Sequence, residues 1–237
     1  MISFIVPAYN EAGLLRATLD ALHAAGRAVA EPYEIVVADD ASTDGTADVA
    51  ANHGARVVRV AHRQIAATRN SGARAANGKL FIFVDADTLV NAGVVGAAVA
   101  AVRGGAVGGG AAVKFDGYVP LYARMLTAAV MPMFRIARMA AGCFLFCTRD
   151  AFEAVGGFDE SFYGAEELVI SRALNERGKF VVLRESVLTS GRKLRTHSLS
   201  EILPILGRLI VKGPAAVKQR GGMDLWYAER RKDPHES

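Results

Sequence analysis

The stretch Leu80-Phe81-Ile82-Phe83-Val84-Asp85-Ala86-Asp87 runs through five apolar residues and then reaches two carboxylates. Five apolar residues in a row, with β-branched and aromatic members and no polar stripe, are typical of a strand buried on both faces of a parallel sheet. Ligands of open α/β sheets bind outside the carboxyl ends of the strands, so Asp85 and Asp87 are expected to face a crevice. In extended chain, side chains two residues apart lean the same way.

Two readings of Asp85-Ala86-Asp87-Thr88 follow from the residue types. Neighbouring carboxylates repel each other, and a hard divalent cation such as Mg²⁺ or Mn²⁺, bound between them and a substrate phosphate, would offset that repulsion. Asp and Thr are also common helix caps, so the same residues could form only a turn that leads into a helix. The tetrapeptide by itself leaves both readings open.

The length and composition of the chain indicate what class of protein it is. The chain has 237 residues, of which 51% are hydrophobic and 22% charged, which is typical of a globular α/β protein with a substantial core. The formal net charge is only +4, and no nucleic-acid partner is expected. Many basic residues follow Lys179. Such an excess is usually a solvated face, but it can also mark a surface that meets anionic lipid or phosphate.

Cysteine usage and hydropathy bear on location. Cys143 and Cys147 lie in an apolar run without the Cys-x-x-Cys spacing of redox or zinc sites, so buried thiols in a reducing compartment are expected. Met1 to Val6 has no basic flank of a secretory signal, and each longer apolar stretch is interrupted by arginine before a bilayer's length. The sequence predicts a cytoplasmic protein, with peripheral contact at the inner face of the membrane left open.

Strands and helices alternate along the first half of the chain. Strands are expected over 2–6, 34–38, 56–60 and 80–84, with a helix after each of the first three, the third over 64–76. Pro7 is expected to end the first strand and Asn10 to cap the following helix. This alternation predicts a doubly wound, mostly parallel sheet. A Gly-x-Gly-x-x-Gly turn and a P-loop are both absent, which argues against a dinucleotide or P-loop fold.

The second half is expected to add strands over 104–114, 142–147 and 180–183. Tyr118 to Met139 predicts one amphipathic helix or two helices broken at Pro132. The methionines of that segment could suit a lipid or hydrophobic acceptor, although an ordinary core helix shows the same pattern.

Four segments together resemble the family 2 glycosyltransferases of GT-A fold. The segments are Ile-Val-Pro-Ala-Tyr-Asn-Glu (5–11), Val-Val-Ala-Asp-Asp-Ala-Ser-Thr-Asp-Gly-Thr (36–46), Ala-Thr-Arg-Asn-Ser-Gly (67–72) and Phe-Val-Asp-Ala-Asp (83–87). The third segment is similar to the Ala-Arg-Asn-x-Gly stretch of that family. The resemblance covers residues 1 to about 190. It implies a GT-A domain over 1–190, divided into a nucleotide-binding half (1–103) and an acceptor half (104–190), with a basic helical extension over 191–237.

The resemblance implies a donor site for a UDP- or GDP-linked sugar. Asp85 and Asp87 would hold Mg²⁺ or Mn²⁺ against the diphosphate, with Asp87 the likelier direct ligand, and Arg192 would clamp the diphosphate. His197 is either a further metal ligand or a structural residue. The remaining donor-site residues implied are Pro7, Ala8, Tyr9, Asn10, Glu11, Asp39, Asp40, Arg69 and Ala86.

The catalytic base implied by the resemblance lies in Glu166-Glu167, which follows Gly-Gly-Phe-Asp-Glu at an expected helix start. By register Glu167 is the base and Glu166 the reserve, although two glutamates also suit a helix's first turn structurally. A separate base fits a single displacement that inverts the sugar. Leu199 to Val211 predicts an amphipathic helix that could lie on an anionic membrane face.

The sequence therefore predicts an inverting, metal-dependent glycosyltransferase. Its acceptor is a hydroxyl of a lipid carrier, polysaccharide, small metabolite or protein. A sugar nucleotidyltransferase remains an alternative, but such enzymes normally carry a glycine-rich loop after the first strand. The other alternative is a non-catalytic nucleotide-sugar-binding domain, which would need no base.

Overall fold

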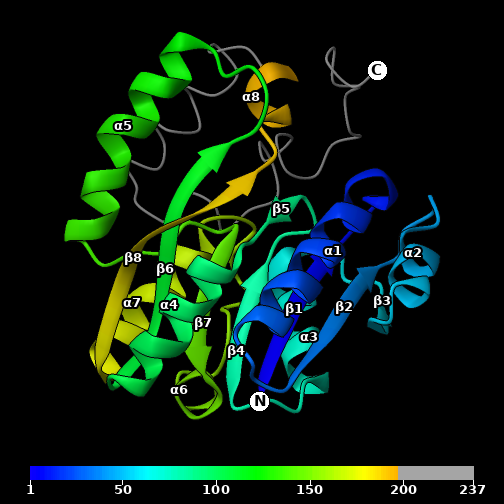
Figure 1. Ribbon diagram of the computed structural model, residues 1–237, viewed down its shortest axis with the longest axis horizontal. Helices are drawn as coiled ribbons and strands as arrows, with labels where there is room; N and C mark the ends of the chain where they lie inside the picture. Colours follow the sequence, from blue (N-terminus) through cyan, green and yellow to red (C-terminus); the bar gives the residue numbers. More distant parts are fainter. Residues whose placement is uncertain (197–237) are drawn as a thin grey trace.

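The computed structural model describes residues 1–196, which form an eight-stranded sheet with helices packed on both faces (Figure 1). The strand order is β3-β2-β1-β4-β7-β6-β8-β5. The elements are β1 (Ile2–Ala8), α1 (Ala12–Ala28), β2 (Tyr33–Asp40), α2 (Thr46–Asn52), β3 (Arg56–Val60), α3 (Ile65–Ala75), β4 (Leu80–Val84), β5 (Thr88–Leu89), α4 (Ala92–Arg103), β6 (Ala106–Phe115), α5 (Leu121–Ile136), β7 (Phe144–Thr148), α6 (Arg149–Ala154), α7 (Glu166–Arg177), β8 (Lys179–Thr189) and α8 (Arg192–Thr196).

The central strand β4 is buried along its whole length, as the sequence predicts. Its alternate side chains enter two separate cores, because successive residues of a strand point to opposite faces. Ile82 and its two alternate neighbours join residues of α1, α2 and α4, whereas Phe81 and Phe83 join residues of α3, α6 and α7. The protein thus has three layers, with helices on each face of the sheet.

The sheet is mostly parallel, which confirms the predicted fold class. β3, β2, β1 and β4 run parallel, and so do β6 and β8. β7 lies between β4 and β6 and runs antiparallel to both. Since the direction reverses twice, β6 runs the same way as β4. The carboxyl ends of β1, β2, β4 and β6 therefore meet at one edge of the sheet.

The end of β1 differs from the prediction at two residues. Pro7 does not end the strand, because it pairs in register with Ala38 of β2. β1 pairs with β4 only as far as Ile5, so one side of the strand has no neighbour beyond that point and tolerates a residue without an N–H. Asn10 is not the helix cap, since α1 begins after Glu11, and its side chain instead accepts from the backbone N–H of Thr43 at 2.8 Å.

Asp44 caps α1 from the neighbouring loop. Its Oδ2 accepts from the N–H of Ala12 at 3.0 Å, and its Oδ1 accepts from the N–H of Thr46 at 3.1 Å. Partial burial alone would raise the pKa of Asp44, but the hydrogen bonds from Thr46 and Ala12 hold it below its ordinary value. The loops after β1 and β2 are thereby tied together beside the carboxyl edge of the sheet.

The segment expected to be helical between Tyr118 and Met139 forms one helix, α5, with Pro132 inside it, so the alternative of two helices broken at this residue is wrong. Both cysteines are free thiols, and Cys147 is fully buried in β7 as predicted, whereas Cys143 is only partly buried. Among residues 1–196, no helix has both the length and the hydropathy needed to cross a bilayer. His197 and the segment from Leu199 to Val211 lie outside the described residues, and the division at residue 103 stays a prediction.

Candidate active site at the carboxyl edge of the sheet

The two carboxylates after β4 lie on a tight turn. The N–H of Thr88 donates to the carbonyl of Asp85 at 3.0 Å, so the segment is not extended as the sequence analysis assumed. The capping alternative is wrong as well, because Thr88 enters β5 and α4 is capped by Asn91, whose side chain accepts from Val94 N–H. Ala86 is buried, and its carbonyl accepts from the hydroxyl of Thr18 at 2.8 Å.

Arg69 lies at the centre of the site and is 2% exposed. Its Nη1 donates to Oε1 of Glu166 at 2.5 Å, and its Nη2 donates to Oδ1 of Asp85 and to the carbonyl of Gly142, both at 2.8 Å. Burial by itself would lower the pKa of Arg69, but Asp85 and then Glu166 raise it above its ordinary value. Both terminal nitrogens are engaged within the protein. This geometry favours an internal cation that positions two carboxylates, and the expected contact of Arg69 with a base or diphosphate stays a prediction.

Glu166 and Glu167 open α7 with different surroundings. Glu166 is 3% exposed and paired with Arg69, whereas Glu167 is only partly buried. The Glu167 carboxyl group lies against Gly142, where an added Cβ would be 3.3 Å from Glu167 Cδ. Burial, and after it the negative charge of Glu166, raise the pKa of Glu167 to about 8. Because Glu166 is committed to an ion pair, Glu167 is the stronger candidate for a base.

Arg192 reaches across the crevice from α8. Its Nη2 lies 3.2 Å from both carboxylate oxygens of Glu11 and 3.9 Å from Oδ2 of Asp87. The N–H of Ser190 also donates to the carbonyl of Asp87 at 3.1 Å, which ties the end of β8 to the turn after β4. A cation beside this turn is consistent with the predicted role of Arg192 at a diphosphate.

The donor set of the turn fits a divalent cation that shares its shell with a substrate. Asp85 and Asp87 have side chains 28% and 16% exposed, and Arg69 contacts only one oxygen of Asp85. No group of three or more His, Cys, Asp and Glu side chains gathers as a metal site within residues 1–196. Mg²⁺ is usually bound in this way, through one or two carboxylates completed by phosphate oxygens and water.

Asp39 and Asp40 end β2 and have separate roles. Asp39 is 2% exposed, and its Oδ1 has no hydrogen-bond partner among the described residues. Asp40 accepts four hydrogen bonds, from the N–H groups of residues 62–64 and from the hydroxyl of Thr68. A buried acceptor without a partner is costly, so of these two residues Asp39 is suited to accept a hydrogen bond from a ligand. Asp40 instead orders the loop before α3, a function that its sequence position did not reveal.

The ring of Tyr9 is in contact with a cationic side chain, which the sequence did not indicate. The guanidinium carbon of Arg63 lies 3.4 Å from the centroid of the Tyr9 ring, which is a cation–π contact. Arg63 has a positive φ of 50°, and its N–H is one of those held by Asp40. The contact joins loops 54 residues apart, so no local pattern could have indicated it. Pro7 and Ala8 lie within β1, next to this pair.

Comparison with known protein families gives a match that includes this edge of the sheet. The sequence model described as glycosyl transferase family 2 matches residues 3–153, which include the turns after β1, β2 and β4. The chain belongs to glycosyl transferase family 2. The predicted resemblance is confirmed.

Among relatives of this family 2 chain, validoxylamine A glucosyltransferase of Streptomyces hygroscopicus subsp. jinggangensis is 28% identical over 264 residues. The match takes in 92% of this chain but only 62% of the relative, so the chain spans about three fifths of that protein's length.

Solved structures show the same GT-A fold. S. aureus TarS 1–349 in complex with UDP-GlcNAc has a TM-score of 0.62 at 20% identity, covering 96% of this chain and 70% of that one. The mannosyltransferase PcManGT of Pyrobaculum calidifontis, in complex with GDP-Man and Mn²⁺, has a TM-score of 0.61 at 22% identity and covers 80% of this chain and 56% of that one.

Proposed function

We propose that this family 2 chain transfers a sugar from a nucleotide-sugar donor to an acceptor hydroxyl with inversion at the anomeric carbon. The observation that carries the proposal is the placement of Glu167. Its carboxyl group is partly buried, has a pKa of about 8, and interacts electrostatically with Arg69, which forms an ion pair with Asp85 at the carboxyl edge of the sheet. A carboxylate with this pKa is a stronger proton acceptor than an ordinary glutamate, and its deprotonated form predominates above about pH 8.

The donor is a UDP- or GDP-linked sugar. Structures similar in fold were solved with UDP-GlcNAc or with GDP-Man and Mn²⁺. In this chain, the unpartnered Oδ1 of Asp39 provides a buried acceptor for a base or ribose. Asp39 pairs with Ala8 of β1, so the stacked side chains of Tyr9 and Arg63 follow directly after its neighbour. Asp39 would accept a hydrogen bond from the base N–H or a ribose hydroxyl.

Asp87 and Asp85 would hold Mg²⁺ or Mn²⁺ beside the diphosphate. When bound, the cation would stabilise the negative charge that gathers on the leaving diphosphate. Arg192, already 3.9 Å from Asp87, would give the same diphosphate a positively charged hydrogen-bond donor.

Glu167 would remove the proton from the acceptor hydroxyl as its oxygen attacks the anomeric carbon. The new bond from oxygen to carbon forms as the bond from carbon to the diphosphate oxygen breaks, and the proton ends on the Glu167 carboxylate. One displacement of this kind inverts the anomeric centre. Glu166 and Arg69, which bind each other at 2.5 Å, would help to keep Glu167 in place.

The first test is the thermal stability of the purified chain against nucleoside diphosphates and nucleotide-sugars, each with and without Mn²⁺. A ligand that binds only the folded state raises the melting temperature. We expect a metal-dependent rise with a uridine or guanosine diphosphate, lost in Asp87→Ala and kept in Asp48→Ala, whose side chain is 80% exposed.

The base is tested separately. Glu167→Gln should keep the metal-dependent rise in melting temperature and lose transfer of sugar to the acceptor. Full activity of Glu167→Gln would remove Glu167 from the mechanism. A wild-type chain that binds a donor but never transfers its sugar would instead favour the non-catalytic binding domain.

A further inference from the structure

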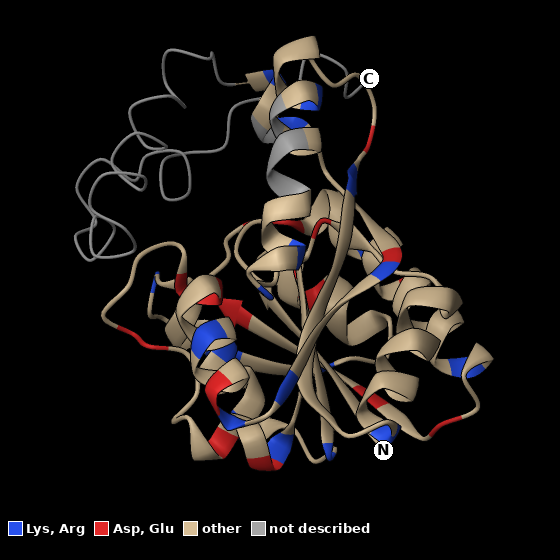
Figure 2. Ribbon diagram, turned by 90° about the vertical axis from the view of Figure 1, so that its left-hand side faces the viewer, with Lys and Arg blue, Asp and Glu red and all other residues tan. Residues whose placement is uncertain are grey.

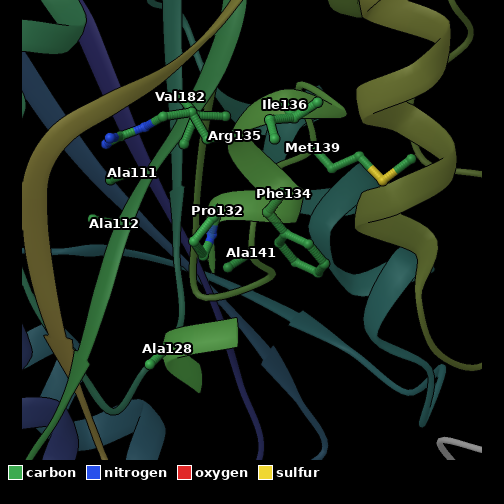
Figure 3. Close-up of a pocket in the computed structure, with 10 residues that line it drawn as sticks. All are labelled: Ala111, Ala112, Ala128, Pro132, Phe134, Arg135, Ile136, Met139, Ala141 and Val182. Atoms are coloured by element: carbon green, nitrogen blue, oxygen red, sulfur yellow. The ribbon is translucent and has the colours of Figure 1, made fainter. Parts of the chain in front are cut away.

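A cleft of about 440 Å³ opens between α5 and the strands β6 and β8. Figure 3 shows the side chains that line it, which come from both strands, from the C-terminal half of α5 and from the segment after it. The lining is aliphatic or aromatic except for Arg135. A concave apolar site of this volume is within the usual range for small-molecule ligands. The lining that the argument uses is Ala112, Val182, Ala128, Pro132, Ile136 and Ala141.

The helix beside this cleft leaves much of its apolar surface exposed. Leu121, Met125 and Met133 are about two thirds exposed, at 66%, 66% and 65%, and Ile136 is 84% exposed. Soluble proteins seldom leave so many large apolar side chains of one helix in water unless that surface binds something. The exposed residues continue the apolar lining beyond the mouth of the cleft, because Ile136 belongs to both.

One wall of the cleft is also next to the proposed base. Ala141 lines the cleft, and the following residue, Gly142, lies against the Glu167 carboxyl group. The N–H of Ala140 donates to the hydroxyl of Ser171, which donates to the carbonyl of Glu167 at 2.6 Å. The segment 140–142 therefore joins the cleft to α7. Neighbouring residues of one segment thus contact the cleft and the proposed base.

The charged side chains of α5 and of the turn after it have one sign, whereas β8 carries both Arg184 and Glu185. α5 and the turn after it carry Arg124, Arg135 and Arg138 and no acidic residue. Figure 2 shows α5 above the body of the protein with only basic residues coloured on it. Arg135 Nη2 donates to the carbonyl of Leu183 at 3.1 Å, which holds this cation at the edge of β8. An apolar cleft with a cationic rim fits a hydrocarbon chain that ends in an anion.

We propose that the cleft binds the hydrocarbon chain of a lipid-linked saccharide, the acceptor of the reaction. The chain lies between α5 and the β6–β8 edge, the phosphate lies at Arg135, and the saccharide presents its hydroxyl to Glu167. This identification rests on the proposed function, because it assigns the acceptor of that same site. The apolar lining carries the choice of a lipid, since it offers a polysaccharide or small polar metabolite almost no hydrogen-bond partners.

The test measures binding of decyl phosphate, below the concentration at which it forms micelles, to the full chain by calorimetry. Inorganic phosphate and decanol serve as probes of the anion and the chain alone. We expect decyl phosphate to bind at least tenfold more tightly than either. Ala128→Trp fills the cleft from an exposed helix position and should weaken decyl phosphate binding at least tenfold. Ala24→Trp, at an exposed position of α1 away from the lining, should leave it unchanged.

Two results would overturn the proposal: no binding of decyl phosphate by the wild-type chain, or equal binding by wild type and Ala128→Trp. Arg135→Gln should weaken decyl phosphate binding and spare decanol binding, and the reverse pattern would also contradict the assignment. Donor binding is measured on the same samples with nucleoside diphosphate and Mn²⁺. Decyl phosphate binding without donor binding would count against the proposed function and leave the lipid site standing.

Discussion

At the scale of single residues, the site depends on one cation shared by several acids. Arg69 is bonded to Glu166 and Asp85, and its charge also acts on Glu167. The charge of Glu166 acts on Glu167 as a neighbour of like sign and helps to raise the pKa of Glu167. The network pairs one glutamate directly with a cation and leaves the next without such a pair, which is how a site obtains one structural acid and one base.

The pKa of Glu167 gives a prediction for the dependence of activity on pH. A base works only when deprotonated, so kcat/KM should rise about tenfold per pH unit below pH 8 and level off above it. The measurement is sugar transfer from pH 5 to pH 9 at donor concentrations below KM. Glu167→Asp, whose shorter side chain retains a carboxylate, should retain a pH-dependent profile at a lower rate. A flat profile across this range would exclude Glu167 as the titrating base.

Arg69 gives a prediction for stability. Arg69→Met leaves Glu166 and Asp85 without their cation, and removing one partner of a buried ion pair costs about 3–5 kcal/mol. Urea unfolding at pH 7 measures the loss. The control is Arg59→Met, because Arg59 is 71% exposed and lies 4.0 Å from Asp48, and exposed pairs contribute at most about 1 kcal/mol.

A second variant separates the loss of the cation from a packing defect. Arg69→Met combined with Glu166→Gln removes both charges of the buried pair at 2.5 Å. This double variant should recover part of the stability that Arg69→Met loses. Equal stabilities of the single and double variants would mean that packing, and not charge, explains the loss.

The contrast between Arg69 and the acidic residues shows what the sequence could reveal at this scale. Asp39, Asp85 and Glu167 follow recognisable strand or helix boundaries, so their place at the carboxyl edge was predictable. The partners of Arg69 are 16 and 97 positions away along the chain. They come together only in the folded protein, where α3 packs against β1 and β2, next to β4 in the sheet. Its internal role therefore could not be inferred from the motif that contains it.

At the scale of elements, α3 must approach the sheet closely to place Arg69. Gly72, one turn after Arg69 on the same helix, makes this possible, because a Cβ there would lie 2.6 Å from Cγ2 of the buried Ile5. A side chain larger than hydrogen would push α3 away from β1. The glycine thus sets the distance between the helix and the sheet beneath the site.

Gly72→Ala should accordingly destabilise the protein by about 1–3 kcal/mol, the range for overpacking a core. Gly96→Ala is the matched control in α4, since its Cβ would meet its nearest neighbour, Val29, at 3.8 Å, an ordinary contact. That change should stabilise the protein by about 0.4–1 kcal/mol, because alanine restricts the unfolded chain. Chemical denaturation of both variants checks the pair. A Gly72→Ala protein as stable as wild type would show that α3 can shift without cost.

Elements were predicted well where burial alone decides them. The strands of the first half and the helix over 64–76 appear within one to two residues of their expected bounds, apart from the longer ends of β1 and β2. Errors arose where a neighbour overrides a local preference. Pro7 stays in β1 because β2 pairs with it, and Pro132 stays within α5. The antiparallel direction of β7 is set by its partners β4 and β6, which periodicity does not record.

At the scale of the whole molecule, the last described helix contacts the loop after the first strand at the site. Arg192 and Glu11 are 181 positions apart, yet they form an ion pair beside Asp87. Glu11 is 6% exposed, so this pair sits inside the crevice rather than on the surface. A diphosphate bound at Asp85 and Asp87 would compete with Glu11 for the same guanidinium. Donor binding would thereby involve both ends of the described chain.

Arg192→Ala should therefore raise KM for the nucleotide-sugar roughly tenfold or more, since a hydrogen bond to a charged group contributes about 1.5–3 kcal/mol. Arg195→Ala is the control on the same helix, because Arg195 Nη1 is held at 2.8 Å by the carbonyl of Asp116. It should lower the melting temperature and leave KM near the wild-type value. Glu11→Gln weakens the competitor for Arg192, so its KM should fall or stay unchanged even if its melting temperature drops. If Arg192→Ala lowered the melting temperature alone, with KM intact, Arg192 would be a structural link between α8 and the loop after β1 and not a donor-binding residue.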